Sequence, residues 1–184
     1  AIDDCRNAGI AFETDPAVIL LARHLASVTA RQSEDALLKR RCMDRIAELR
    51  QHPALLTLAV RGVAHDAAAK DRFHSDGRKA LRRLAETLGL DPAHYDLRSN
   101  RSHASRSGEI TLHGEELWMQ LSLHGTMADR EVIYRRVSGR HDHLGERDCY
   151  ASIRDLLAPE RFAVRLRKEL RLTPPVAEPV SLFG

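Results

Sequence analysis

The stretch best suited to chemistry lies at residues 98–108, where three arginines and four serines stand close together. Guanidinium forks and hydroxyl groups are the donors that bind carboxylates and the phosphates of a nucleic acid. The stretch lacks a Gly-x-x-x-x-Gly-Lys pattern, so it does not indicate nucleotide hydrolysis by a P-loop. We expect a loop that contacts an anion, and the alternative is a loop whose arginines are simply solvated.

Arginines are frequent elsewhere in the chain, and we interpret them together with this loop. Only four of the 29 basic residues are lysines, although the formal net charge is just +3. Arginine recognises phosphate with a bidentate fork, whereas lysine acts as a point charge. A G/C-rich coding sequence would also favour arginine. The predicted contact residues are Arg98, Arg101, Arg106, Arg135, Arg136, Arg140, Arg161, Arg165, Lys168 and Trp118, the last as a surface anchor unless it packs under a helix.

A second pattern with chemical potential is the sequence His-Asp-His at 141–143. Imidazole and carboxylate both supply lone pairs to transition metals, but one short segment does not complete a site. Further ligands would have to come from His103, His113 or His124. Such a metal would activate water for phosphodiester cleavage. The alternative is that two histidines stand close together by chance, because the chain has ten of them. Apart from such a metal, we expect no cofactor. The candidate metal ligands are His141, Asp142 and His143.

No residue stands out as a nucleophile for covalent catalysis. A Gly-x-Ser-x-Gly motif is absent, and the three cysteines, Cys5, Cys42 and Cys149, form no C-x-x-C pair. They therefore indicate neither a disulfide framework nor a four-cysteine zinc site, and they favour a reducing, cytoplasmic location. No apolar run has the length of a signal peptide or a membrane span, so we expect no membrane association. A leader removed before Ala1 stays an open alternative.

The first half of the chain predicts helices, because apolar residues recur there at helical spacing. Asp15 and Pro16 are typical of a helix start, and Gly89 is typical of a helix end. Gly62 weakens the third run, which we expect to be interrupted. The predicted helices cover 16–30, 33–53, 54–73 and 78–88.

Residues 82–90, followed by Asp91 and Pro92, also look like the first helix and turn of a helix-turn-helix. A recognition helix would then have to cover 95–100, and this segment has little helical periodicity. We therefore interpret Gly89 as an ordinary helix stop and keep the helix-turn-helix only as an alternative.

After Pro92 the pattern changes to the alternation that is typical of strands. Within residues 116–123, Leu117 and Met119 would face one way while Trp118 and Gln120 face the other, as in a sheet with one buried face. The predicted strands cover 95–98, 109–113, 116–123 and 131–138, followed by a polar loop at 139–148 and a helix that ends near residue 170.

These elements predict an α+β fold. An N-terminal helical bundle, residues 1–90, would pack with a small antiparallel sheet of three to four strands and a C-terminal helix, residues 91–172. A proline-rich tail, residues 173–184, would follow, and the whole would form one compact unit.

Several segments resemble a group of known sequences. They lie at 84–90, 95–100, 107–113, 130–136 and 139–140. In these segments the chain is similar to uncharacterised proteins carried on conjugative plasmids and integrative elements of proteobacteria. The resemblance spans roughly residues 84–150 and implies a mobile-element setting, but it brings no catalytic signature.

We expect a non-enzymatic accessory protein that binds a nucleic acid or a nucleoprotein partner through its arginine-rich loops. Two alternatives stay open. The first is a metal-dependent phosphodiesterase or nuclease centred on His141. The second is a protein-binding inhibitor or assembly module that uses Trp118, the helical bundle and the apolar tail residues Val180, Leu182 and Phe183. The sequence leaves the oligomeric state and the choice between DNA, RNA and protein open.

Overall fold

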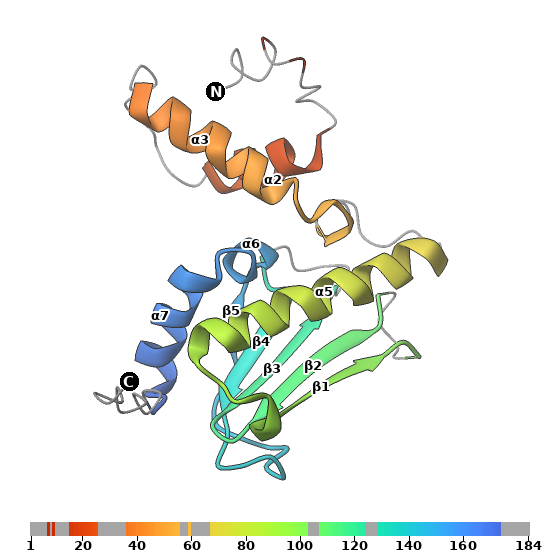
Figure 1. Cartoon of the computed structure of the whole chain (residues 1–184), viewed down its shortest axis with the longest axis vertical. Coiled ribbons are helices and arrows are strands. Elements are labelled where there is room, and N and C mark those ends of the chain that lie inside the picture. The colour runs from red at the N-terminus through yellow and green to blue at the C-terminus, as the bar shows by residue number, and fades with distance from the viewer. Residues whose placement is uncertain are drawn as a thin grey trace, which may run out of the picture.

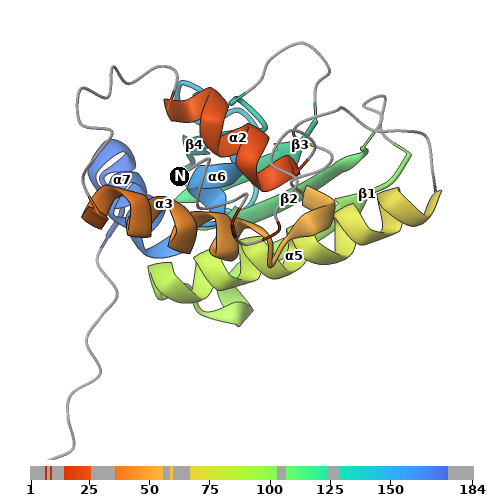
Figure 2. The same ribbon diagram turned by 90° about the horizontal axis from the view of Figure 1, so that it is seen from above.

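The computed structural model describes residues 7, 9, 15–25, 36–55, 59, 67–102, 107–123 and 129–173. Figure 1 shows a sheet with helices α5 and α7 beside it, while helices α2 and α3 lie beyond one end of the strands. Seen from above, α5 runs along the length of the sheet (Figure 2). Within the described ranges, no helix is both long and apolar enough to cross a membrane.

Five strands form an antiparallel meander in which each strand pairs with the next one along the chain. They are β1 (Tyr95–Asn100), β2 (Glu109–Gly114), β3 (Leu117–Ser122), β4 (Val132–Arg136) and β5 (Cys149–Ala151). The α+β class is confirmed. The fifth strand, β5, lies in a region for which we predicted no strand, because three residues are too few to show an alternating pattern.

The two faces of the sheet differ, because successive side chains point to opposite sides. One face is apolar and is covered by α5 and α7. Tyr134 on this face packs against Phe162 of α7, with ring centroids 5.6 Å apart. Its buried residues are Ile110, Leu112, Leu117, Met119, Leu121, Val132 and Tyr134. The opposite face carries residues that stay partly exposed, among them Trp118, Gln120, Ile133 and Arg135, so the predicted orientation of Trp118 and Gln120 is confirmed.

Helix α5 (Ala67–Leu88) is continuous. The division that we predicted between runs at 54–73 and 78–88 is therefore wrong from residue 67 onward. Gly77 interrupts the sequence pattern, but close packing accounts for it: a Cβ at this position would lie 2.5 Å from Cδ1 of Ile110. The glycine thus lets α5 approach the sheet. The helix ends at Gly89, as predicted, with a left-handed φ of 71°.

Strand β1 follows this helix after a short 3₁₀ turn, η1 (Pro92–His94). A helix-turn-helix would need a recognition helix where β1 stands, so that alternative is excluded. Arg78 of α5 donates from Nη1 to the carbonyl of Leu97 at 2.8 Å and fastens the helix to this strand.

Helices α6 (Ile153–Leu156) and α7 (Pro159–Leu170) complete the sheet domain. Ser152 and Asp155 form a capping box at the start of α6. Buried Glu131 accepts a hydrogen bond from the Ile153 amide at 3.2 Å, and burial raises the pKa of its carboxyl. The inner side of α7 is buried, as predicted, through Phe162, Leu166 and Leu170.

Helices α2 (Pro16–Leu25) and α3 (Ala36–Leu49) form a pair beyond the strand ends. Asp15 caps α2 as predicted, because its Oδ1 accepts from the amides of Ala17 at 3.0 Å and Val18 at 3.1 Å. Arg50 donates from Nε to Oδ2 of the same carboxylate at 3.0 Å and ties the end of α3 to the start of α2. The predicted continuation of the first helix over 26–30 and the tail from residue 174 lie outside the described residues.

Candidate functional site

The loop between β4 and β5 is held together by Asp142. Its Oδ1 accepts from the amides of Leu144 at 3.1 Å and Gly145 at 2.8 Å, and its Oδ2 accepts from the amide and the hydroxyl of Ser138, both at 3.0 Å. These hydrogen bonds hold the pKa of Asp142 well below its usual range. The carboxylate that we predicted as a metal ligand therefore stabilises its own loop by accepting hydrogen bonds from it.

Arg135 fastens this loop to the uncovered face of the sheet. Its guanidinium lies 3.9 Å from the ring centroid of Trp118, the residue opposite it on β3. It donates to Oδ1 of Asp148 at 2.9 Å and to the carbonyl of His143 at 3.0 Å. Gly145 packs closely against it, since a Cβ there would lie 2.9 Å from Cδ of Arg135. Arg135 and Trp118 are thus engaged with each other and with the loop.

A second arginine clamps the same loop to β1. Arg140 contacts Oδ1 of Asp96 at 3.0 Å and donates to the carbonyl of Ala93 at 3.2 Å. Arg98 contacts Oδ2 of Asp96 at 3.1 Å. The hydrogen bond and charge of Arg140 lower the pKa of Asp96, and Arg98 adds to the effect. One carboxylate therefore serves two of the predicted contact arginines.

A groove with a volume of about 990 Å³ opens between this loop and the edge of the sheet. It brings together Arg98 and Arg140 with the residues from His141 to His143, as well as His113 and two more carboxylates. We call Arg98, Arg135, Arg140 and the loop 137–148 the groove side. Arg98 and Arg140 share Asp96, and Arg135 pairs with Asp148, whereas exposed Arg147 has no ion pair among the described residues.

The histidines of the groove converge only in part. His113 and His143 meet edge to face, with ring centroids 5.4 Å apart. His113 is 8% exposed, its Nε2 has no hydrogen-bond partner in the described part of the chain, and burial lowers its pKa. Among the described residues no group of three histidine, cysteine or carboxylate side chains is arranged to hold a metal ion. His103 and His124 lie outside these residues.

Other arginines of the predicted loops also have acidic partners. Arg101 pairs with Asp71 of α5. Arg136 lies 3.2 Å from Oε1 of Glu116, whose other oxygen accepts from the Thr173 amide at 2.8 Å. Arg106 lies outside the described residues.

The outer side of α7 carries charge of a different kind. Arg161, Lys168 and Arg171 are exposed, and no acidic side chain within the described ranges forms an ion pair with them. Arg165 is the exception, because it binds the Tyr134 hydroxyl at 2.8 Å and Glu169 at 3.3 Å. Helix α7 covers the apolar face of the sheet, and none of these residues lines the groove. We therefore describe the predicted contact residues as two groups.

Sequence reasoning missed Arg154 of α6. Its side chain is partly buried, and Nη1 is buried with no hydrogen-bond partner in the described residues. Arg45 of α3 and Arg161 of α7 are near enough for their charges to lower its pKa, after burial itself. We call Arg154, Arg161, Lys168 and Arg171 the helix side. No local signal marks Arg154, because its neighbours come from other helices.

Comparison with known proteins finds no matching family model, no matching curated protein and no matching solved structure.

Proposed function

We propose that this protein is a non-enzymatic accessory protein that binds a nucleic acid or a nucleoprotein complex, and that the helix side makes the contact. The observation that carries the proposal is a set of exposed cations on α7 and directly after it that have no acidic partner among the described residues, namely Arg161, Lys168 and Arg171. Phosphate binding needs guanidinium and ammonium groups whose charge is not already neutralised.

The geometry of α7 suits a phosphate backbone. Residues 161 and 168 are seven apart, which places them on one side of the helix two turns apart, and residue 171 continues this side. The apolar contacts of Phe162 and Leu166 hold the opposite side of α7 on the domain. The cations are therefore displayed on a rigid element rather than on a loop.

The groove side supports the proposal less, because Arg98, Arg135 and Arg140 already have acidic partners. The resemblance of residues 84–150 to mobile-element proteins agrees with a nucleic-acid setting, and we include that setting in the proposal. Arg161 and Lys168 lie outside the segment that carries the resemblance.

The test measures binding of a fluorescent DNA duplex, and of single strands of DNA and RNA, between roughly 50 and 200 mM salt. We expect affinity to fall as salt rises, because counterions are released on binding. The double variant R161E/K168E should weaken binding at least tenfold and reduce the salt slope by about 1 to 2, as each phosphate contact contributes about 0.9.

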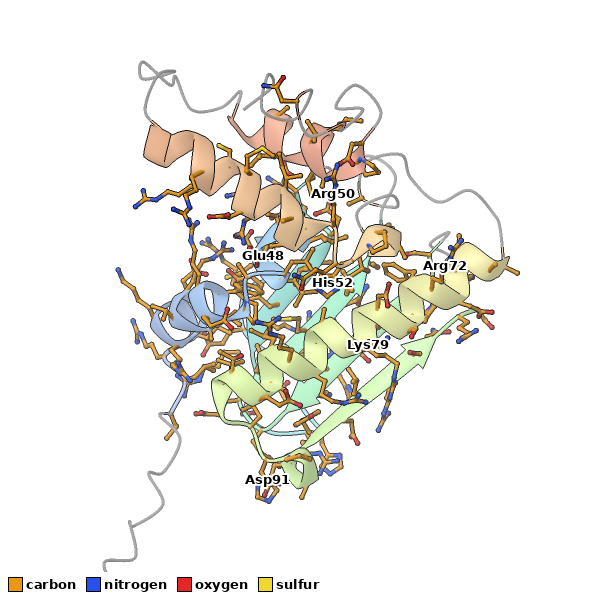
Figure 3. The ribbon with its side chains drawn as sticks, turned by 45° about the horizontal axis from the view of Figure 1, so that its top comes forward. Glu48, Arg50, His52, Arg72, Lys79 and Asp91 are labelled. Carbon is orange, nitrogen blue, oxygen red and sulfur yellow. The ribbon has the colours of Figure 1, made fainter. Side chains whose placement is uncertain are left out.

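The matched control is K70E/R72E, which makes the same change in net charge on α5, at exposed Arg72 and partly exposed Lys70. Figure 3 shows Arg72 at the end of α5 that is far from α7. This variant should keep nearly all of the affinity. Equal losses of affinity in both double variants would show that only the net charge matters. An unchanged affinity of R161E/K168E would reject the helix side as the contact surface. A partner retained after nuclease treatment would favour the protein-binding alternative instead.

A further inference from the structure

The outer edge of β1 is open to pairing with another strand. Figure 1 shows β1 at the edge of the sheet opposite β5, and no described strand lies on its outer side. Such an edge presents amide and carbonyl groups that extend the hydrogen-bond ladder of an added strand. The edge of β5 is less suitable, because β5 has only three residues and Arg165 donates to the carbonyl of Tyr150 at 2.7 Å.

The register of the sheet shows which backbone groups of β1 face outward. In an antiparallel ladder, successive residues direct their amide and carbonyl groups to alternate sides of the strand. The amide of Ser122 donates to the carbonyl of Glu131 at 2.9 Å, so the even-numbered residues of β3 bond to β4. Because the registers between β1, β2, β3 and β4 are unbroken, the even-numbered residues of β1 bond to β2. Tyr95, Leu97 and Ser99 therefore direct their backbone groups outward.

The charges of β1 suit pairing with a second copy of the same strand. When two copies run antiparallel about Leu97, Asp96 of each copy lies opposite Arg98 of the other. Both are positions without inter-strand hydrogen bonds across this edge, where opposite side chains come closest. Registers centred on either neighbour would instead place Asp96 or Arg98 opposite itself. The side chain of Arg98 is 75% exposed and shares Asp96 with Arg140, so it can reach a second carboxylate.

Arg78 of α5 lies at the centre of this edge. Its Nη1 donates to the carbonyl of Leu97 at 2.8 Å, and a strand that pairs about Leu97 needs the same carbonyl as an acceptor. We propose that β1 pairs with β1 of a second copy of this chain, and that Arg78 limits this association by competing for the Leu97 carbonyl. A carbonyl oxygen has two lone pairs, so the competition weakens the pairing without abolishing it. The inference goes beyond the proposed function, because it needs no nucleic acid.

The first experiment measures the mass of the full chain by sedimentation equilibrium, without nucleic acid and over a wide range of protein concentrations. The dissociation constant of the dimer should be about tenfold lower in R78M than in the wild type, because a competing hydrogen bond is removed. R82M makes the same substitution at an exposed arginine of α5 and should behave like the wild type. Monomeric R78M at every concentration would overturn the inference, and an unchanged dissociation constant would overturn the role of Arg78.

A charge exchange tests whether β1 is the surface that pairs, and it stays decisive if R78M does not fold. R98D and D96R should each raise the dissociation constant about tenfold, because like charges then lie opposite each other at two positions. An equimolar mixture of the two variants should recover the association, since every carboxylate again faces a guanidinium group. A mixture that associates no better than either variant alone would contradict the pairing. S99P should also prevent it, because proline fits an edge strand but lacks the outward amide.

Discussion

The groove side and the helix side are both rich in arginine, but most of the groove-side arginines have acidic partners and the outermost cations of the helix side have none among the described residues. On the groove side, Asp96 pairs with both Arg98 and Arg140, and Asp148 pairs with Arg135. On the helix side, Arg161 and Lys168 have no acidic partner in the part of the chain that the structure describes. A count of arginines along a sequence therefore does not measure the charge that a partner meets.

The difference follows from how the backbone of the loop and the backbone of α7 satisfy their hydrogen bonds. The loop 137–148 has no regular hydrogen-bond ladder, so side chains such as Asp142 and Arg135 must hold it in place. Helix α7 satisfies its own backbone and is held by Phe162 and Leu166, which leaves its outer residues without a structural task.

The largest effect is expected from R135A, which should lower the free energy of unfolding by about 2 to 3 kcal/mol. The substitution removes the stacking on Trp118 and leaves the His143 carbonyl and Asp148 without their donor. Urea denaturation followed by Trp118 fluorescence and by circular dichroism measures the change.

R161A is the control from the helix side, and it should change stability by no more than about 0.5 kcal/mol. R135K should fall between R135A and the wild type, because it keeps a charge near Asp148 and loses the fork. Equal stability of R135A and R161A would remove the structural distinction between the two sides.

A smaller effect is expected from pH, and only on the groove side. Burial lowers the pKa of His113 in the folded chain, whereas the unfolded chain binds the proton near pH 6.5. The stabilisation by neutral His113 is therefore complete above pH 6.5 and is lost as the pH falls below it, because the unfolded state then binds more protons. Urea midpoints at pH 7.5, 6.5 and 5.5, as chosen test conditions, should fall stepwise in the wild type.

H113N should flatten this dependence, and H141N, a change at an exposed histidine of the loop 137–148, should leave it in place. Among the described residues, two further histidines with lowered pKa values, His52 and His74, contribute in the same direction. Figure 3 places His52 between Glu48 of α3 and Lys79 of α5. A slope in H113N as steep as in the wild type would show that groups other than His113 cause the acid sensitivity.

The smallest effect is expected from D96N, which releases Arg98 and Arg140 from their shared carboxylate. Affinity for the labelled duplex should rise about two- to threefold at low salt and return to the wild-type value near 200 mM, because distant charges are screened. E86Q makes the same charge change at an exposed residue of α5 and gives the baseline. If the salt slope of D96N were steeper than that of the wild type by about 0.9, the value of one phosphate contact, the groove side would touch the nucleic acid as well.

Sequence patterns predicted features that are local. The alternation in 116–123 indicated which residues of β3 face the core, and Asp15 and Gly89 marked helix ends, because burial period and capping depend on near neighbours. The pairing of Arg140 with Asp96 and the position of Arg154 beside Arg45 depend on the folded topology. For this reason the sequence predicted several of the candidate residues but not their division into two sides.

The glycine at position 77 shows how far contact with the sheet governs α5. An isolated peptide of this helix would gain about 1 kcal/mol from alanine at that position, since glycine is a poor helix former. In the folded chain the added methyl group would collide with Ile110 and Leu121, so the same replacement would push the helix away from its support. Residue 77 thus gives up intrinsic helix propensity in favour of close contact, so part of the stability of α5 comes from its packing on the sheet.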